Sequence, residues 1–426
     1  MTATADGLEI RALDLRAESA EFLTGLARLL VDAYPIMHVD STDAFERFVE
    51  SLREGSAYAQ ARWVVAERDG ALAGAMRLYD YEMNVRGRDA LTGGLGSVAV
   101  SVLHKRRGIA RAMVAWYIED YRRRGAPFAA LYPFRLDFYR ALGFGYGTPM
   151  QRYRFAPATL QGGGARGTVR LLGEADLDAL IACNERVRAS TNGLIKRHGF
   201  PTRRALRNAE LRFVGVEEGG TLRGSMQTRA IAFDAPRNRD ELEVRDLLCE
   251  DEAYTAALLA YLHAQRDQFA RVTIESQDAA FYLAAAGDPR DGSDLMVAPP
   301  AAHRVAETGL GIMYRILDVE GAFAHLPASP AAFVLRLVID DSFVRETRGD
   351  WTFRFGPHGA PRREDGARPD VTLTIGIHDL SSVVMGSLRL RDVVRHRLAS
   401  LEPRDRLAMI DAAFAAEQPP VCTTRF

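Results

Sequence analysis

The 426-residue sequence predicts two α/β units followed by an α+β domain. Three observations lead to this prediction. Two successive stretches show the same order of expected elements, a glycine-dense segment at 161–167 separates them, and the last stretch places its strands before its helices. Alternating strands and helices are typical of α/β domains, and strands followed by helices of α+β domains. With a second boundary near 298–302, we expect domains at residues 1–160, 168–300 and 301–426.

The first stretch combines the helical and the strand periodicity. Leu23, Leu26 and Leu30 share one face of an expected helix, and Asp69-Gly70 is a favoured hairpin turn because both residues tolerate positive φ. In order, the expected elements are a strand at 8–11, a helix at 17–33, a hairpin of strands 63–66 and 72–76, a strand at 95–102, a helix at 109–124 and a strand at 128–132.

The second stretch repeats this order. Its expected elements are a strand at 169–172, a helix at 175–187, a hairpin of strands 213–216 and 222–226, a strand at 242–248, a helix at 254–269 and a strand at 272–274. A duplicated unit explains the shared order, and chance similarity of two α/β domains is the alternative. The third stretch shows strands at 333–339, 351–355 and 371–375, then helices at 380–385 and 405–414.

Composition excludes several classes of protein. Lys and Arg total 55 against 56 Asp and Glu, whereas a nucleic-acid-binding protein normally has a basic surplus. The first seven residues lack the apolar core of a signal peptide, and no stretch approaches the ~20 apolar residues that span a bilayer. Cys183, Cys249 and Cys422 form no CxxC pair, so neither a disulfide framework nor a zinc ribbon fits. We expect a cytoplasmic protein without a metal site, nucleic-acid partner or membrane span.

The segment with the clearest chemistry joins a strand to a helix. Val98-Ala99-Val100 ends an apolar strand, the basic residues Lys105-Arg106-Arg107 follow, and Gly108 precedes the helix. The first N–H groups of a helix have no partner within it and carry the positive end of its dipole, so they form a site for phosphate groups. We expect Gly108 to let the backbone approach a phosphate, and Arg106 and Arg107 to add charge. The alternative is a helix start whose arginines are simply solvated.

Two motifs carry a family resemblance. Lys105-Arg106-Arg107-Gly108-Ile109-Ala110 resembles the acetyl-CoA pyrophosphate loop of GNAT N-acetyltransferases, Arg/Gln-x-x-Gly-x-Gly/Ala, with Lys105 in place of Arg or Gln. Phe138-Tyr139 with Gly143-Phe144 resembles the Phe-Tyr-x-x-x-Gly-Phe motif common in the same fold. With its three-part layout and its final Phe426, the whole chain resembles the Eis (enhanced intracellular survival) family. Those proteins join two GNAT-like domains to a sterol-carrier-protein-like domain, and they usually form hexamers.

The resemblance implies a reaction and a set of site residues. Acetyl-CoA would be the co-substrate, a small-molecule amine the acceptor, Tyr139 the general acid and the C-terminal carboxylate of Phe426 the general base. A backbone N–H near Val98, where two GNAT strands splay apart, would polarise the thioester carbonyl. The expected cofactor-binding positions are Val98, Ala99, Val100, Arg106, Arg107, Gly108, Ile109, Ala110, Arg111, Phe134 and Arg135.

Physical chemistry is compatible with both catalytic roles. A phenol with a pKa of ~10 is protonated at neutral pH and can donate its proton. A terminal carboxyl with a pKa of ~3.5 needs burial to become a better base, and Pro419-Pro420 would direct the tail rigidly. The alternatives are a core tyrosine at 139 and a frayed chain end at 426. His104 is expected to position the loop rather than to catalyse.

The role of the second unit and the identity of the acceptor are less narrowly defined by the sequence. Residues 248–252 are acidic where the first unit is basic, so we expect that the second unit has lost its cofactor site and forms a wall of the substrate pocket. The resemblance favours a polycationic, aminoglycoside-like acceptor, but a protein lysine or a polyamine fits the chemistry equally. A non-catalytic regulatory protein and a lipid carrier are the alternative functions. Candidate acids for holding a cation are Asp32, Asp40, Glu82 and Glu119, and candidate tunnel residues of a carrier are Leu380, Val383, Val384 and Met385.

Overall fold

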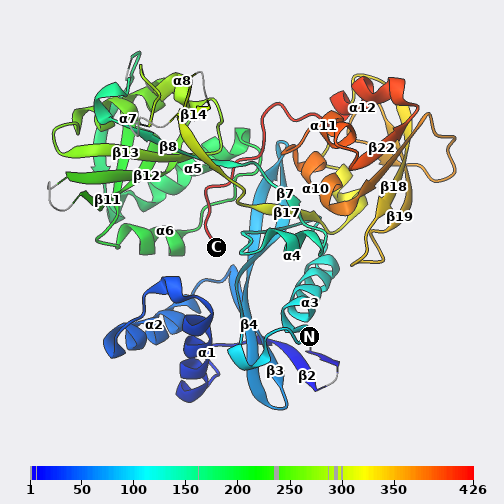
Figure 1. Cartoon of the computed structure of the whole chain (residues 1–426), viewed down its shortest axis with the longest axis horizontal. Coiled ribbons are helices and arrows are strands. Elements are labelled where there is room, and N and C mark those ends of the chain that lie inside the picture. The colour runs from blue at the N-terminus through cyan, green and yellow to red at the C-terminus, as the bar shows by residue number, and fades with distance from the viewer. Residues whose placement is uncertain are drawn as a thin grey trace. The chain divides into compact units, whose positions relative to one another are not determined.

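The computed structural model describes residues 2–5, 7–161, 163–234, 239–285, 287–291, 296–298 and 301–426 (Figure 1). The described chain forms two compact units. Unit 1 contains Met1–Gly147, Ile312–Glu417 and Phe426, and unit 2 contains Thr148–Gly311 and Gln418–Arg425. Parts of three sequence-based expectations lie outside the described residues: Met1 and Asp6 of the N-terminus, Gly162 of the expected linker, and Pro299 and Pro300 of the second boundary.

The main sheet of unit 1 carries the predicted α/β elements. Its strands β4 and β5 form a long antiparallel hairpin, and β5 pairs with β6 in parallel. The strand order is β1 (Thr2–Ala5), β2 (Leu8–Leu13), β3 (Ala61–Arg68), β4 (Ala71–Val85), β5 (Arg88–Val100), β6 (Phe128–Leu131), β17 (Met313–Ile316) and β7 (Gly145–Tyr146). Helices α1 (Ala20–Ala33) and α2 (Thr42–Gly55) lie on one side of this sheet and α3 (Ile109–Arg123) on the other (Figure 1).

Local sequence explains these helices. The hydroxyl of Ser19 accepts a hydrogen bond from the backbone N–H of Phe22, so α1 begins at Ala20 and not at 17. The leucines of α1 pack with Trp63, Val65 and Ala75 from one face of the sheet. Helix α3 buries Met113 and its aromatic residues against the other face, as its spacing predicts. The sheet is therefore covered on both sides by amphipathic helices.

The sheets do not follow the expected domain boundaries: besides the two strands below, β16 (Ala306–Gly309), which was expected in the third domain, joins the sheet of unit 2. Strand β17, which was expected in the third domain, lies between β6 and β7 in the main sheet of unit 1. Strand β8 (Met150–Phe155), which was expected in the first domain, pairs with β13 in the sheet of unit 2. Each exchanged strand pairs N–H and C=O groups that would otherwise lie open at a sheet edge.

The sheet of unit 2 repeats the first architecture. Its order is β16 (Ala306–Gly309), β8, β13 (Phe269–Ser276), β12 (Arg239–Cys249), β11 (Thr221–Asp234), β10 (Arg212–Glu218) and β9 (Thr168–Leu172). Helices α5 (Leu177–Ser190), α6 (Gly199–Leu206), α7 (Glu252–Ala264) and α8 (Phe281–Ala285) accompany it, and β14 (Met296–Ala298) pairs separately with β15 (Ala302–His303). The expected helix at 254–269 is five residues too long at its end, because α7 stops at Ala264 and Phe269 already pairs with Asp240.

The C-terminal part of unit 1 is the predicted α+β domain. Its sheet has the order β20 (Arg362–Arg363), β19 (Gly349–Phe355), β18 (Phe333–Asp340), β21 (Val371–Gly376) and β22 (Ala399–Glu402). Its helices are α9 (Val319–Phe323), α10 (Ile377–Met385), α11 (Leu390–Arg395) and α12 (Leu407–Phe414). Stacked rings fill the interior, with centroids 4.3 Å apart for Phe323 and Phe353. The order of α/β units followed by an α+β domain is therefore confirmed.

Of the helices in the described part of the chain, none is long and apolar enough to cross a lipid bilayer.

Candidate active site

The site begins where β5 parts from β6. The two strands pair in parallel only from Thr92 to Leu95 on β5. Beyond this point the register of β5 with β4 shifts between Ala75 and Arg77, and Ser97 takes a left-handed φ of 50°. This bulge turns the strand away from β6, as the expected splay requires. Backbone groups of the segment 96–100 are thereby released from pairing with β6.

Tyr34 fixes the bulge from the side of the helices. Tyr34 follows α1, and its hydroxyl donates a hydrogen bond to the carbonyl oxygen of Val98 at 2.9 Å. Burial raises the pKa of Tyr34 to about 12, so the hydroxyl stays a donor at neutral pH. The sequence alone does not reveal this residue, because nothing in the local pattern of α1 indicates a contact with β5.

The basic loop leads directly into an uncapped helix. Gly108 is the N-cap of α3 with a φ of 78°, and no side chain accepts hydrogen bonds from the first turn. The exposed side chains of Arg106 and Arg107 have no ion-pair partner in the described part of the chain. The N–H groups of the first turn and two free guanidinium groups thus stand together, a suitable arrangement for a pyrophosphate.

The structure gives a conformational reason for glycine at position 108, in addition to the expected approach of a phosphate. A Cβ built at this position meets no atom within 4 Å, so the protein itself leaves the space open. The positive φ is what favours glycine here, since other residues pay about 1 kcal/mol or more for this conformation. Arg111, in the same helical turn, places its guanidinium 4.7 Å from the ring centroid of Phe343. Its backbone N–H, rather than its side chain, is the group available to an anion.

Phe134 and Arg135 follow β6 on the far side of the splay. The Phe134 side chain is 65% exposed and lies edge-on to Tyr139, with ring centroids 6.1 Å apart. Arg135 is exposed and forms an ion pair with its neighbour Asp137. Of these two predicted positions, Phe134 therefore presents an open apolar surface, whereas the charge of Arg135 is already paired.

Tyr139 is placed by α4 (Leu136–Arg140) inside a ring cluster. Its side chain is only 2% exposed and packs edge-on against Phe138 and Phe144, with centroids 5.0 Å and 5.9 Å away. Burial, with a smaller contribution from Tyr34, raises the pKa of Tyr139 well above that of a free phenol. The phenol thus keeps its proton throughout the neutral range and can act only as an acid there.

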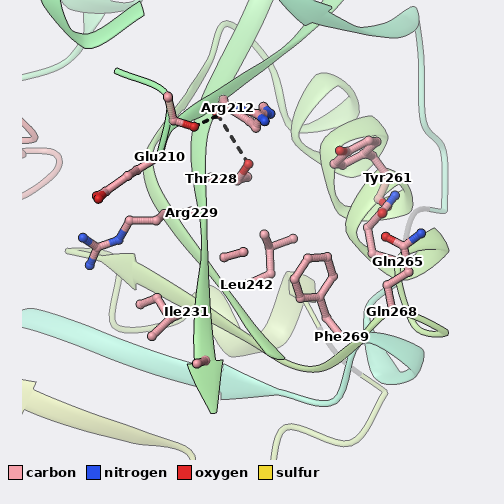
Figure 2. A pocket seen from close by; sticks show the side chains of 13 residues that line it. Glu210, Arg212, Thr228, Arg229, Ile231, Leu242, Tyr261, Gln265, Gln268 and Phe269 are labelled. Atoms are coloured by element: carbon pink, nitrogen blue, oxygen red, sulfur yellow. Dashed lines mark hydrogen bonds between the residues drawn. The ribbon is translucent and has the colours of Figure 1, made fainter. Parts of the chain in front are cut away.

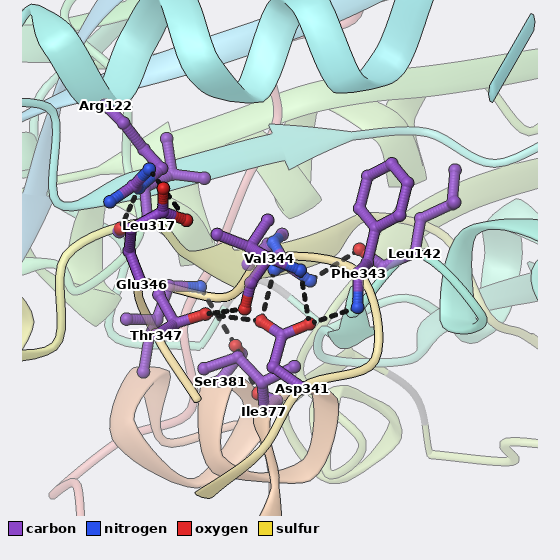
Figure 3. Close-up of polar contacts among 12 residues, drawn as sticks. Arg122, Leu142, Leu317, Asp341, Phe343, Val344, Glu346, Thr347, Ile377 and Ser381 are labelled. Carbon is purple, nitrogen blue, oxygen red and sulfur yellow. Dashed lines mark hydrogen bonds and ion pairs between the residues drawn. The ribbon is translucent and has the colours of Figure 1, made fainter. Parts of the chain in front are cut away.

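A buried arginine fixes the loop after α4. Arg315 of β17 donates to the carbonyl oxygen of Leu142 and forms an ion pair with Asp341. Figure 3 shows Asp341 accepting further hydrogen bonds from the N–H groups of Phe343 and Val344. A Cβ on Gly143 would lie 1.3 Å from Nη1 of Arg315, which explains the glycine of the Phe-Tyr-x-x-x-Gly-Phe motif.

The chain end lies on β4 and β5. The ring of Phe426 packs edge-on against Tyr79, Tyr81 and Tyr132, with centroids 5.7 Å, 5.0 Å and 5.4 Å away. A Cβ on Gly96 would lie 2.7 Å from the carboxyl carbon of Phe426. Only glycine at position 96 therefore leaves room for the terminal carboxylate, which sits on β5 directly before the bulge.

The tail before Phe426 is held by hydrogen bonds within unit 2. The N–H of Val421 donates to the carbonyl oxygen of Asn192 at 2.7 Å, and the N–H of Cys422 donates to Oε1 of Gln277 at 2.6 Å. Arg425 forms an ion pair with Glu275. The alternative of a frayed terminus is therefore wrong for this chain.

The candidate acids of unit 1 do not gather around Phe426. Glu119 pairs with Arg122 and Arg123 on α3, and Asp32 and Asp40 are exposed. Glu82 lies on β4 one residue beyond Tyr81, so alternation turns it to the opposite face of the strand. His104 ends a short 3₁₀ turn before the basic loop, and its Nδ1 is buried without a hydrogen-bond partner in the described structure.

Unit 2 has the same bulge, but the N-terminus of its helix α7 is capped by a side chain. The register between β11 and β12 shifts between Ser225 and Gln227, and Asp246 takes a φ of 54° like Ser97 of the first unit. The N-cap of α7, however, is Asp251, whose carboxylate accepts the N–H of Ala253 at 2.7 Å. A chain carboxylate thus already occupies the place where an anion would bind.

Figure 2 shows a surface hollow of unit 2. It is bordered by β11, the last turn of α7 and the start of β13, and none of the predicted site residues lines it. Among the residues that the structure describes, no three His, Cys, Asp or Glu side chains gather in a way that could hold a metal ion.

Models of known domain families match both the N-terminal and the C-terminal part of the chain. Residues 16–147 match the acetyltransferase (GNAT) domain, and residues 319–423 match the sterol carrier protein domain. An uncharacterized N-acetyltransferase of Streptomyces coelicolor is 26% identical over 347 residues, which is 76% of this chain and 80% of that protein. N-acetyltransferase Eis of Mycobacterium tuberculosis is 35% identical over 156 residues, which is 33% of this chain and 39% of Eis.

Solved structures share the fold over the full length. A GCN5-related N-acetyltransferase from Kribbella flavida aligns with a TM-score of 0.76 at 22% identity, covering 100% of both chains. Eis1 from Mycobacterium abscessus aligns with a TM-score of 0.76 at 21% identity, covering 98% of this chain and 100% of its own. At such identities these likenesses concern the fold alone.

Proposed function

We propose that the chain, which matches the GNAT domain and is similar to Eis, moves the acetyl group of acetyl-CoA to a primary amine, with Tyr139 as general acid and the terminal carboxylate of Phe426 as general base. The observation that carries this proposal is the position of the Phe426 carboxyl group at Gly96, beside the bulge that parts β5 from β6. An acid and a base from distant parts of the sequence thereby belong to one compact unit.

The residues of α3 and β5 fit acetyl-CoA. The N–H groups of Ile109, Ala110 and Arg111 would hold its pyrophosphate, with Arg106 and Arg107 adding positive charge. The released backbone at Val98–Val100, with Phe134 and Arg135 across the splay, would line the rest of the co-substrate. Backbone donors placed at the bulge would stabilise the oxyanion of the tetrahedral intermediate.

The proposed proton path uses the two chain groups in sequence. The carboxylate of Phe426 accepts a proton from the ammonium group of the acceptor, which leaves a neutral amine able to attack the thioester carbonyl. As the C–S bond breaks, Tyr139 donates its proton to the leaving thiolate, and the amide nitrogen then gives its extra proton to the tyrosinate, which restores the phenol. The raised pKa of Tyr139 means that the phenol still carries its proton when the thiolate forms.

For the acceptor we propose a polycationic, aminoglycoside-like amine, chiefly on the resemblance to Eis. The ring cluster of Tyr79, Tyr81, Tyr132 and Phe426 supports a cationic acceptor, since aromatic faces attract an ammonium group. A cytoplasmic location and a homohexamer belong to the same proposal and rest on the same resemblance.

A thiol-release assay tests the function. Acetyl-CoA is incubated with the full chain and a panel of an aminoglycoside, a polyamine, a lysine-containing peptide and a monoamine, and free CoA thiol is measured. We expect turnover that depends on the amine and is fastest with the aminoglycoside. Tight acetyl-CoA binding without turnover on any amine would instead support the non-catalytic regulatory alternative.

A further inference from the structure

The tip of the β4–β5 hairpin presents an arginine in an unusual backbone conformation. Arg86 takes a left-handed φ of 53°, followed by Gly87 at 83°. The side chain of Asn84 accepts the N–H of Gly87 at 2.7 Å and so closes the turn. A non-glycine residue at positive φ is uncommon, and in a hairpin turn it directs the side chain outward from the strand ends.

The guanidinium group of Arg86 binds the ends of two helices in the C-terminal domain. Its Nε donates to the carbonyl oxygen of Val384 at 2.8 Å and its Nη2 to that of Val383 at 3.2 Å, both in the last turn of α10. Its Nη2 and Nη1 also donate to the carbonyl oxygens of Phe414 and Ala415, at 2.7 Å and 2.9 Å. These carbonyls belong to the last turns, where helical partners are lacking and the dipole is negative.

Arginine suits this position for two reasons. Burial lowers the pKa of Arg86 to about 10, which still leaves the group charged at neutral pH. Only a guanidinium has enough N–H donors in a rigid plane to reach four carbonyl oxygens at once. Gly386, at φ 89°, clears the space, since a Cβ there would lie 3.3 Å from Nη2 of Arg86 and 2.4 Å from Cβ of Ala416.

The same hairpin also receives the far end of the tail. The tail leaves α12 at Phe414 and Ala415, which Arg86 binds, and it ends at Phe426. Tyr79 and Tyr81 on β4 contact the ring of Phe426, and Gly96 on β5 makes room for its carboxyl group. One hairpin therefore holds the tail where it starts and where it ends.

We infer that Arg86 is a positioning residue for the general base: it fixes the start of the C-terminal tail to the same β4–β5 hairpin that receives the Phe426 carboxylate. This inference rests on the proposed role of Phe426. Small displacements of a reacting group are costly, and a shift of about 1 Å can lower a rate by about 10²-fold.

The first part of the test compares two arginines of one hairpin. Arg88 donates to the carbonyl oxygen of Ala324 at 2.7 Å, so it binds the same domain but not the tail. We expect Arg86→Met to lower kcat by about 10- to 100-fold and to leave the Kd of acetyl-CoA and the KM of the amine within about twofold. The matched control Arg88→Met should keep the kcat of the wild type. Equal losses in both variants would overturn the inference, because they would indicate general domain docking.

The second part is a double-mutant cycle with the chain end. A short C-terminal extension displaces the carboxylate, and Arg86→Met is measured with and without it. If Arg86 acts through the tail, the substitution costs little further activity in the extended chain. Additive losses would overturn the inference, while an extension without effect on kcat would remove the proposed role of Phe426 and the inference with it. Should Arg86→Met not fold, Arg86→Lys, which keeps the charge but fewer donors, takes its place in the cycle.

Discussion

At the residue scale, the proposed reaction uses two chain groups, the phenol of Tyr139 and the terminal carboxylate of Phe426. The phenol of Tyr139 is buried among rings, and the carboxylate of Phe426 lies on a glycine of β5. Of the two, the motif around Tyr139 could be recognised from the sequence. The contact of Phe426 with Gly96 could not, because it joins residues that no local pattern relates. The same holds for the hydroxyl of Tyr34 on Val98.

The terminal carboxylate gives the first prediction. Amidation of Phe426, made by ligation of a synthetic C-terminal peptide, removes the negative charge and leaves the ring in place. We expect kcat to fall by roughly 10²–10⁴, the usual range for a lost general base, with an unchanged Kd for acetyl-CoA. The same ligation with an unmodified peptide is the control. Full turnover of the amidated chain would move the base to a side-chain carboxylate or a water relay.

The second prediction concerns the hydroxyl of Tyr139. Tyr139→Phe removes the proton donor and keeps the ring that packs on Phe138 and Phe144. We expect a lower kcat and a melting temperature within about 2 °C of the wild type, because a single hydroxyl deletion away from a buried network costs little stability. Since burial raises the pKa of Tyr139, the wild-type rate should show no loss from ionisation of this group below pH 10. An unchanged kcat in Tyr139→Phe would exclude it as the acid.

At the element scale, local patterns predicted most helices and strands, and the failures have a common cause. Helix α3 and the β4–β5 hairpin follow from periodicity and turn chemistry. The places of β8 and β17 do not, because a strand's partner is chosen by the free edge it meets and not by its own residues. The bulge shared by β5 and β12 adds a structural argument for duplication that the sequence alone lacks.

The contrast between the starts of α3 and α7 gives the third prediction. Calorimetric titration should find one acetyl-CoA site per chain, because the N-terminus of α3 is uncapped and basic, whereas Asp251 caps the corresponding helix α7 of unit 2. Arg106→Glu combined with Gly108→Glu should abolish binding by placing two negative charges at the pyrophosphate site. As the control, Arg203→Glu with Arg204→Glu reverses two exposed charges on α6 and should leave the Kd unchanged. A second site per chain would contradict the assignment of unit 2 as a cofactor-free unit.

At the scale of the whole molecule, assembly gives the fourth prediction. The resemblance to Eis proteins leads us to expect a homohexamer. Light scattering coupled to size-exclusion chromatography should then give a mass about six times the 47.0 kDa of the chain at micromolar concentration. A monomer that retains full activity would show that the proposed chemistry needs no assembly.

The last prediction distinguishes two roles of the C-terminal domain, a scaffold for the tail and a lipid carrier. Leu380, Val383, Val384 and Met385, the candidate tunnel residues, are fully buried in α10, and the rings of Phe333 and Phe355 in the sheet of the same domain stack 4.6 Å apart. Residues packed in this way behave as core, so Leu380→Ala should lower the free energy of unfolding by about 2–5 kcal/mol. Truncation of a residue that lines an open tunnel would lower the free energy of unfolding far less. Chemical denaturation measures this difference, and native mass spectrometry of the purified wild type provides the independent readout. A small destabilisation together with a co-purified lipid would establish the carrier alternative, whereas a large destabilisation without lipid supports a domain whose solid core places α12 and the start of the tail.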